Sequence, residues 1–102
     1  ATESIVSSGC IVSGSEVRRS ILCPDVRIHS FCDVEDSILL PGAVVRRHAR
    51  IRRAIVDRGV EVPRGALVGY DAAEDRRRHT VSEGGVVVVT PGEECLVRPD
   101  YL

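Results

Sequence analysis

The feature that most constrains the fold of this chain is an internal repeat of 17 residues. Aliphatic residues recur at this spacing in separate columns, and each column takes one member from each successive copy of the repeat. The columns are Leu22, Leu39 and Val56; Ile11, Ile28, Val45 and Val62; and Val17, Val34, Ile51 and Val68. A column of small residues accompanies them: Ser15, Cys32, Ala49 and Ala66. Ser4-Ile5-Val6 matches Ser20-Ile21-Leu22 one residue out of phase, so we expect the first copy to be one residue short.

The spacing within each copy of the repeat indicates a chain that turns a corner about every six residues. From Leu22 to Leu39 the aliphatic positions fall at steps of 6, 6 and 5, which fits neither a helical stripe at period 3.6 nor a long alternating strand. Three short strands would then form one triangular coil, and successive coils would stack as parallel sheets about 4.8 Å apart. We therefore predict a parallel β-helix of about four coils over residues 4–69. The alternative, a small β-sandwich, would need alternating strands spaced by 8–12 residues.

The composition agrees with an all-β fold and excludes several classes of protein. The 102 residues include 17 Val and only three aromatic residues, which favours strands over a helical bundle. A net charge of −1 provides no general attraction to nucleic acid, and no apolar run approaches the 18 residues of a membrane span. The four cysteines have mostly aliphatic neighbours and no metal-ligand spacing, and no leader opens the chain. We expect a cytoplasmic protein with reduced cysteines, no metal site, and no nucleic-acid or membrane partner.

Residues 70–102 break the repeat, and we expect them to cap the open end of the β-helix. A polar stretch at 71–80 predicts a helical turn around residues 72–75, and the valine run predicts a final strand over residues 85–90. Residues 93–102 carry little pattern, so we expect them to be loosely held.

No group of residues in the sequence predicts a catalytic centre. Gly-x-Ser-x-Gly, Walker and Gly-x-Gly-x-x-Gly motifs are missing from the sequence. His29 and His48 are 19 residues apart and so do not share a column, and His79 lies outside the repeat. We expect all three histidines to lie on the surface or at corners, and we assign no catalytic residue.

The basic residues are the most informative polar feature, because all 14 are arginine. Seven of them surround one level of the predicted prism: Arg46, Arg47, Arg50, Arg52, Arg53, Arg58 and Arg64. Such a set either binds anions such as phosphates or carboxylates, or forms a solvated face that nearby acidic residues balance. The residue pattern leaves both interpretations open.

Several segments together resemble the C-terminal left-handed β-helix domain of bacterial ADP-glucose pyrophosphorylase, also called glucose-1-phosphate adenylyltransferase. In the repeat they are residues 7–14, 17–22, 26–32, 55–60 and 62–65. In the tail they are Val68-Gly69, Glu74-Asp75, Arg77-Arg78 and Gly85-Val86-Val87-Val88-Val89-Thr90. The left hand of the β-helix is implied by this resemblance alone, since general crossover rules favour the opposite hand.

The resemblance implies a function for a larger protein of which this chain is one part. Members of that family make ADP-glucose and pyrophosphate from ATP and glucose 1-phosphate for glycogen or starch synthesis. Catalysis and its Mg²⁺ lie in an N-terminal nucleotidyltransferase domain, so this chain alone is expected to be inactive and to need no cofactor. The β-helix domain contacts that catalytic domain, helps to assemble a homotetramer, and takes part in allosteric binding of sugar phosphates, pyruvate or AMP.

The resemblance also implies candidate effector contacts. Arg58, in the Asp57-Arg58 motif, is the first candidate, and Ser7, Ser8 and Gly9 are weaker ones. Arg52 and Arg53 match an arginine pair of the family, for which a structural role is equally open. After Thr90 this chain departs from the basic, helix-forming tail usual in the family, so the type of effector stays open. A small hexapeptide-repeat acyltransferase is the alternative function, and His29 or His48 would then have to be catalytic.

Overall fold

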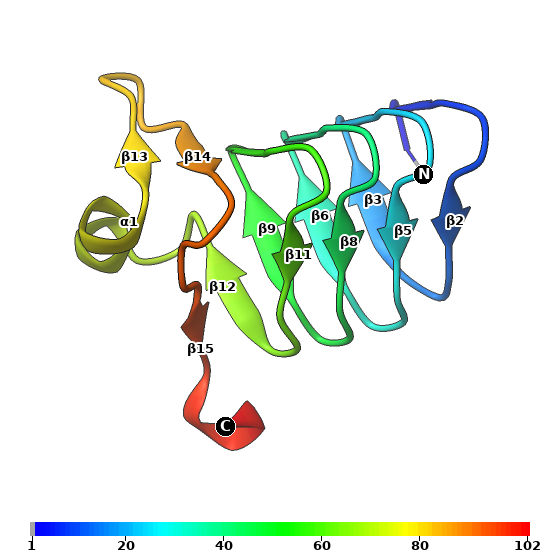
Figure 1. Cartoon of the computed structure of the whole chain (residues 1–102). Coiled ribbons are helices and arrows are strands. Elements are labelled where there is room, and N and C mark those ends of the chain that lie inside the picture. The colour runs from blue at the N-terminus through cyan, green and yellow to red at the C-terminus, as the bar shows by residue number, and fades with distance from the viewer. Residues whose placement is uncertain (1) are drawn as a thin grey trace.

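A computed structural model describes residues 2–102, and twelve of its strands wind into a triangular prism (Figure 1). The first face holds β1 (Ile5–Val6), β4 (Ile21–Leu22), β7 (Ile38–Leu39) and β10 (Ala54–Val56). The second face holds β2 (Ile11–Val12), β5 (Arg27–Ile28), β8 (Val44–Val45) and β11 (Glu61–Val62). The third face holds β3 (Glu16–Arg18), β6 (Asp33–Glu35), β9 (Arg50–Arg52) and β12 (Ala66–Val68). Within each face the strands pair in parallel, one from each coil. The prediction of a left-handed parallel β-helix of about four coils is confirmed.

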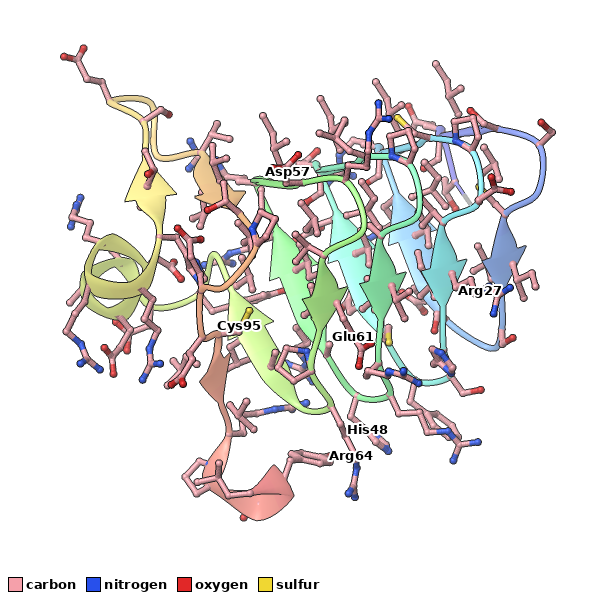
Figure 2. The ribbon with its side chains drawn as sticks, viewed as in Figure 1. Arg27, His48, Asp57, Glu61, Arg64 and Cys95 are labelled. Atoms are coloured by element: carbon pink, nitrogen blue, oxygen red, sulfur yellow. The ribbon has the colours of Figure 1, made fainter. Side chains whose placement is uncertain are left out.

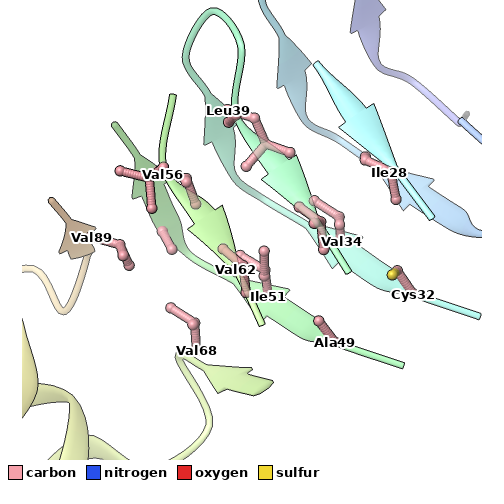
Figure 3. Packing of buried hydrophobic residues seen from close by; sticks show 14 of the residues in the cluster. Ile28, Cys32, Val34, Leu39, Ala49, Ile51, Val56, Val62, Val68 and Val89 are labelled. Atoms are coloured by element: carbon pink, nitrogen blue, oxygen red, sulfur yellow. The ribbon is translucent and has the colours of Figure 1, made fainter. Parts of the chain in front are cut away.

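Three columns of aliphatic side chains fill the interior of the prism, one from each face (Figure 3). Leu22, Leu39 and Val56 are fully buried in one of them, and the strand register stacks each on the next. Burial of each such side chain stabilises the fold by about 1.5–3 kcal/mol. The interior of the prism is narrow, so the side chains that fill it are mostly the small aliphatic ones of Val, Ile, Leu and Ala.

The first coil is short by one residue, as predicted, since Ile5 pairs with Ile21 across 16 positions. The shortening changes one predicted column. Val12, and not Ile11, pairs with Ile28 and points inward. The lost residue lies at the next corner, because Val12 and Val17 are five positions apart whereas Ile28 and Val34 are six.

Buried serines link successive coils at the start of the first face. The Ser37 hydroxyl donates to the Glu35 carbonyl at 2.8 Å and accepts from the Ala54 N–H at 3.3 Å. Ser20 repeats this arrangement one coil earlier, accepting from the Ser37 N–H at 3.1 Å. Each hydroxyl therefore satisfies a backbone N–H of the next coil.

At the second corner, which joins the second face to the third, backbone turns with positive φ carry a stack of aromatic rings. Phe31 and His48 both have a φ of +63°, and their rings stack with centroids 5.1 Å apart. The next position in this column is Gly65, with a φ of +73°. A Cβ on Gly65 would overlap the ring of Tyr101, which lies there instead and continues the stack on His48.

The tail leaves the prism after the fourth coil and then resumes it. Residues 70–84 form an insertion with α1 (Ala72–Arg78) and β13 (Thr80–Val81), and β14 (Val87–Val89) pairs in parallel with β10 (Figure 1). Asp71 caps α1 by accepting from the Glu74 N–H, so the predicted helical turn is confirmed. Beyond β14, the Thr90 carbonyl accepts from the Glu93 N–H. The Asp57 carbonyl accepts from the Val60 N–H in the same way at the corner one coil earlier. The chain therefore begins a fifth coil with another corner.

The expectation that residues 93–102 are loosely held is wrong. β15 (Leu96–Val97) pairs antiparallel with β12, and the 3₁₀ helix η1 (Pro99–Tyr101) brings Tyr101 onto His48. Arg98 anchors this segment, with its Nε donating to the Gly65 carbonyl at 3.3 Å and its guanidinium bonding the His48 carbonyl. The tail thus blocks the open edge of the third face, while β14 covers that of the first.

The expected surface position of His79 is also wrong, because its side chain is buried. Its Nδ1 lies 2.8 Å from Oε1 of Glu93, which also accepts from the Thr90 N–H at 2.9 Å. Burial alone would raise the pKa of Glu93, but these two hydrogen bonds outweigh it and hold that pKa below its usual value. The contact joins the end of α1 to the corner at which the fifth coil begins.

We predict that Ser37→Ala lowers the free energy of unfolding by about 1–3 kcal/mol, because the buried Ala54 N–H loses its acceptor. Urea unfolding followed by circular dichroism measures this change. The control is Ser13→Ala, at an exposed serine, which should shift stability by less than about 0.5 kcal/mol. Equal effects of the two substitutions would contradict the role of the serine ladder.

We predict that Glu93→Gln destabilises the fold at pH 7 by about 1 kcal/mol, because the ionised carboxylate strengthens both hydrogen bonds. A depressed folded-state pKa gives stability that is present above the ordinary pKa of 4.5 and is lost as the pH falls through the folded value. The difference between the two proteins should therefore disappear in acid. Urea unfolding at pH 7 and pH 3 tests this, with exposed Glu94→Gln as control.

Candidate functional site

The candidate residues lie on two different corners of the prism. The first corner joins the first face to the second. Backbone hydrogen bonds link its turns from coil to coil: the Asp25 N–H donates to the Ser8 carbonyl, the Gly42 N–H to the Pro24 carbonyl and the Gly59 N–H to the Pro41 carbonyl. This register stacks Ser7-Ser8-Gly9 and Asp57-Arg58-Gly59 on one edge, in the first and fourth coils. Three rungs of about 4.8 Å separate them by about 14 Å. The structure therefore brings Arg58 and Ser7–Gly9 to the same edge but not into contact.

Arg58 presents a guanidinium that is available to a ligand. Its backbone N–H donates to Oδ1 of Asp57 at 2.7 Å, whereas its side chain is exposed and makes no ion pair within residues 2–102. Gly59 beside it leaves open space where a side chain would stand. Asp57 itself is fixed, because its N–H donates to the Val89 carbonyl at 2.9 Å. Figure 2 places Asp57 on the edge of the prism opposite to His48 and Arg64.

Arg52 and Arg53 lie on the third corner, which joins the third face to the first face of the next coil. There they hold the two ends of the insertion. Nε of Arg52 donates to the Gly69 carbonyl at 2.8 Å, and its guanidinium lies 4.3 Å from the centre of the Tyr70 ring. The Arg53 guanidinium bonds the Gly84 carbonyl. The chain leaves the prism at Gly69 and returns after Gly84, so the pair clamps the insertion at its base.

The third corner also carries several ion pairs that link successive coils. Arg18 and Arg19 occupy the positions two coils before Arg52 and Arg53, and Glu35 and Asp36 lie between the two pairs. Arg19 Nε donates to Asp36 at 2.8 Å, and this hydrogen bond and charge hold the pKa of Asp36 below its usual range. Alternating charge at 17-residue spacing was the sequence signal for this column.

The remaining arginines of the predicted cluster do not form one patch. Nε of Arg46 donates to Glu61 at 2.9 Å, and Arg64 lies over the Tyr101 ring at 5.2 Å from its centre. Arg47 and Arg50 are exposed. The prediction that the cluster surrounds one level of the prism is wrong, because Arg47 and Arg64 occupy the same position in successive coils. The cluster spans the third and fourth coils and is divided among the corners.

Two cavities adjoin the tail, and neither is lined by Arg58. The larger, of about 620 Å³, lies between the second face and the tail, with Glu61, Arg78, Glu93 and Cys95 on its walls. Burial raises the pKa of the Cys95 thiol to about 11, so this thiol is a poor nucleophile at neutral pH. The smaller, of about 240 Å³, is enclosed by the insertion and the Arg52–Arg53 pair.

Two of the three histidines, His48 and His79, make packing or hydrogen-bond contacts within the fold. The His48 ring is stacked between Phe31 and Tyr101, so both of its faces are covered. Within residues 2–102 no three His, Cys, Asp or Glu side chains are grouped to hold a metal ion. The helices of this same range are all too short or too polar to cross a membrane.

The sequence reasoning missed Tyr101, Arg98 and the His79–Glu93 pair. A signal for the first existed, because Gly14, Phe31, His48 and Gly65 form a column at 17-residue spacing in which Gly65 leaves a vacant place. Arg98 and Glu93 lie outside the repeat, so no periodic pattern marks their contacts.

Comparison with known proteins places this geometry in a family. The family model described as GlmU-like, C-terminal hexapeptide matches residues 1–89. A glucose-1-phosphate adenylyltransferase of Koribacter versatilis (strain Ellin345) is 51% identical over 97% of this chain and 24% of its own length. Proteins of the same name from Albidiferax ferrireducens and Methylococcus capsulatus are 53% and 47% identical, over 88% and 94% of this chain.

These matches confirm the resemblance that the repeat and the tail indicate. The chain spans less than a quarter of the length of the three relatives, at 24%, 21% and 22%. The family model covers the whole prism, from β1 to β12, and continues through β14. The chain therefore belongs to the GlmU-like C-terminal hexapeptide family.

Proposed function

We propose that this chain is the C-terminal regulatory and assembly domain of a glucose-1-phosphate adenylyltransferase. The whole enzyme would convert ATP and glucose 1-phosphate to ADP-glucose and pyrophosphate in the cytoplasm, for glycogen or starch synthesis. The observation that carries the proposal is the 51% identity to a protein of that name, which extends over 97% of the chain and includes the non-repeating tail.

In this proposal the chemistry takes place outside the chain. An N-terminal nucleotidyltransferase domain of the same protein supplies the catalytic residues and binds Mg²⁺. The raised pKa of Cys95 favours this division, because its buried thiol is a poor nucleophile at neutral pH. The β-helix then supports the catalytic domain and contributes to a homotetramer.

We assign the effector contact within this chain to Arg58. A guanidinium binds phosphate or carboxylate in two parallel hydrogen bonds, which suits sugar phosphates, pyruvate and AMP. The exposed position of Arg58 and its lack of an ion pair in residues 2–102 leave it free to do so. Arg52 and Arg53 would act indirectly, by fixing the insertion, and Ser7–Gly9 would contact a second part of the same surface.

We predict that the 102-residue chain alone forms no ADP-glucose. A coupled assay for pyrophosphate release, with the longer native protein as positive control, measures this. Titration of the chain with coenzyme A tests the acyltransferase alternative in the same preparation. Turnover by the chain, or saturable coenzyme A binding, would contradict the proposal.

We predict that Arg58→Ala in the longer enzyme raises the activator concentration needed for half-maximal response about tenfold or more. Loss of one charged hydrogen bond costs about 1.5–3 kcal/mol, and 1.4 kcal/mol corresponds to a factor of ten. Turnover without effector should persist. The matched control is Arg47→Ala, an exposed arginine on another corner. Lost basal turnover with an unchanged activator response would refute the assignment.

A further inference from the structure

The N-terminal end of the prism exposes side chains that belong to its interior. Val6 and Val12 are 46% and 37% exposed, although they occupy the columns of Leu22 and Ile28, which are 0% and 1% exposed one coil later. The C-terminal end is covered on two faces by β14 and β15. The N-terminal end has no comparable cover within residues 2–102.

The backbone at this end lacks partners in a regular pattern. In the second coil the upstream-facing carbonyls each accept from an N–H of the first coil: Ser20, Leu22, Val26, Ile28 and Cys32. One coil earlier the register places the equivalent carbonyls on Ser4, Val6, Cys10, Val12 and Ser15. Nothing upstream donates to them in the described part of the chain. These acceptors lie along all three faces, so a preceding segment that satisfies them with its own backbone N–H groups would follow the same triangular path.

A residue of such a preceding path is already in place. The Thr2 N–H donates to the Val17 carbonyl at 2.8 Å, and the Arg19 N–H donates to the Thr2 carbonyl at 2.9 Å. Thr2 forms a parallel bridge with Arg18, which lies on the third face of the first coil. Thr2 therefore occupies the third face of a coil that comes before the first.

We propose that the segment preceding residue 1 in the longer protein winds into one further coil, which covers the exposed ends of the interior columns. This rests on the proposed function only in that the chain is part of a longer protein. Relatives about four times as long provide the necessary chain length. A repeat of 16 or 17 residues places the aliphatic partners of Val6 and Val12 about 11–12 and 5–6 residues before residue 1.

Two other occupants would cover the same end in a different way. A flat surface of another domain would shield outward-facing and inward-facing residues alike. A second copy of this chain would shield them only at concentrations that support association. A further coil shields inward-facing positions selectively, because outward-facing side chains of a β-helix remain on its surface.

Thiol labelling of two adjacent positions separates these cases. Val12→Cys places a thiol inside the column, and Ile11→Cys, the matched control, places one on the outer surface of the same strand. Maleimide labelling is measured by mass spectrometry in the longer native protein and in the 102-residue chain, so that each site serves as its own reference. Val6→Cys provides a second inward-facing site on another face.

We expect labelling at position 12 to slow at least tenfold in the longer protein, labelling at position 11 to change less than about twofold, and neither rate to depend on dilution. Unchanged labelling at position 12 would overturn the proposal. Equal protection of both sites would indicate a flat domain surface, and protection lost on dilution would indicate a second copy; each overturns it too. Formation of ADP-glucose by the same protein tests the proposed function independently of the labelling pattern.

Discussion

The backbone ladder between coils is the interaction on which the rest of this structure depends. Each strand donates N–H groups to the coil that follows, so every coil must contain the same number of residues in each face. The ladder places one inward side chain per face per coil directly over the next, and the narrow interior selects small aliphatic side chains. The same constraint forces sharp corners, where Phe31, His48, Asp36 and other non-glycine residues adopt positive φ at a cost of about 1–2 kcal/mol each.

What could be predicted from the sequence follows directly from this ladder. The period identifies the columns because hydrogen bonding forbids a change of coil length inside a face. The period assigned Ile11 to a column that in fact contains its neighbour Val12. The reason is that a corner of the first coil is shorter by one residue, which shifts the register. Spacing alone could not distinguish two neighbouring aliphatic residues, whereas the pairing with Ile28 does.

The wrong predictions for the tail have a different physical reason. Tyr101 docks because Gly65 has no side chain, and Arg98 reaches the carbonyl of a residue 50 positions away. The burial of His79 likewise depends on Glu93, which reaches it only after the chain has resumed the prism. Such contacts leave no periodic trace, because they join a non-repeating segment to a repeating one. The arginine pair was ambiguous for a related reason: its acceptors are the backbone carbonyls of Gly69 and Gly84, which no side-chain pattern reveals.

The arginines of the third corner and Arg58 on the first are nevertheless connected through one strand pair. β14 receives a hydrogen bond from the Asp57 N–H at its end and donates one from the Val87 N–H to the Arg53 carbonyl at its beginning. The strand that follows the insertion therefore runs from the clamp to the corner of Arg58 across three paired residues. The anion that we propose for Arg58 would therefore lie on a corner that hydrogen-bonds the same strand as Arg53, the residue that contacts the returning chain at Gly84. The first corner and the base of the insertion are thus joined by hydrogen bonds to the two ends of the same strand, β14.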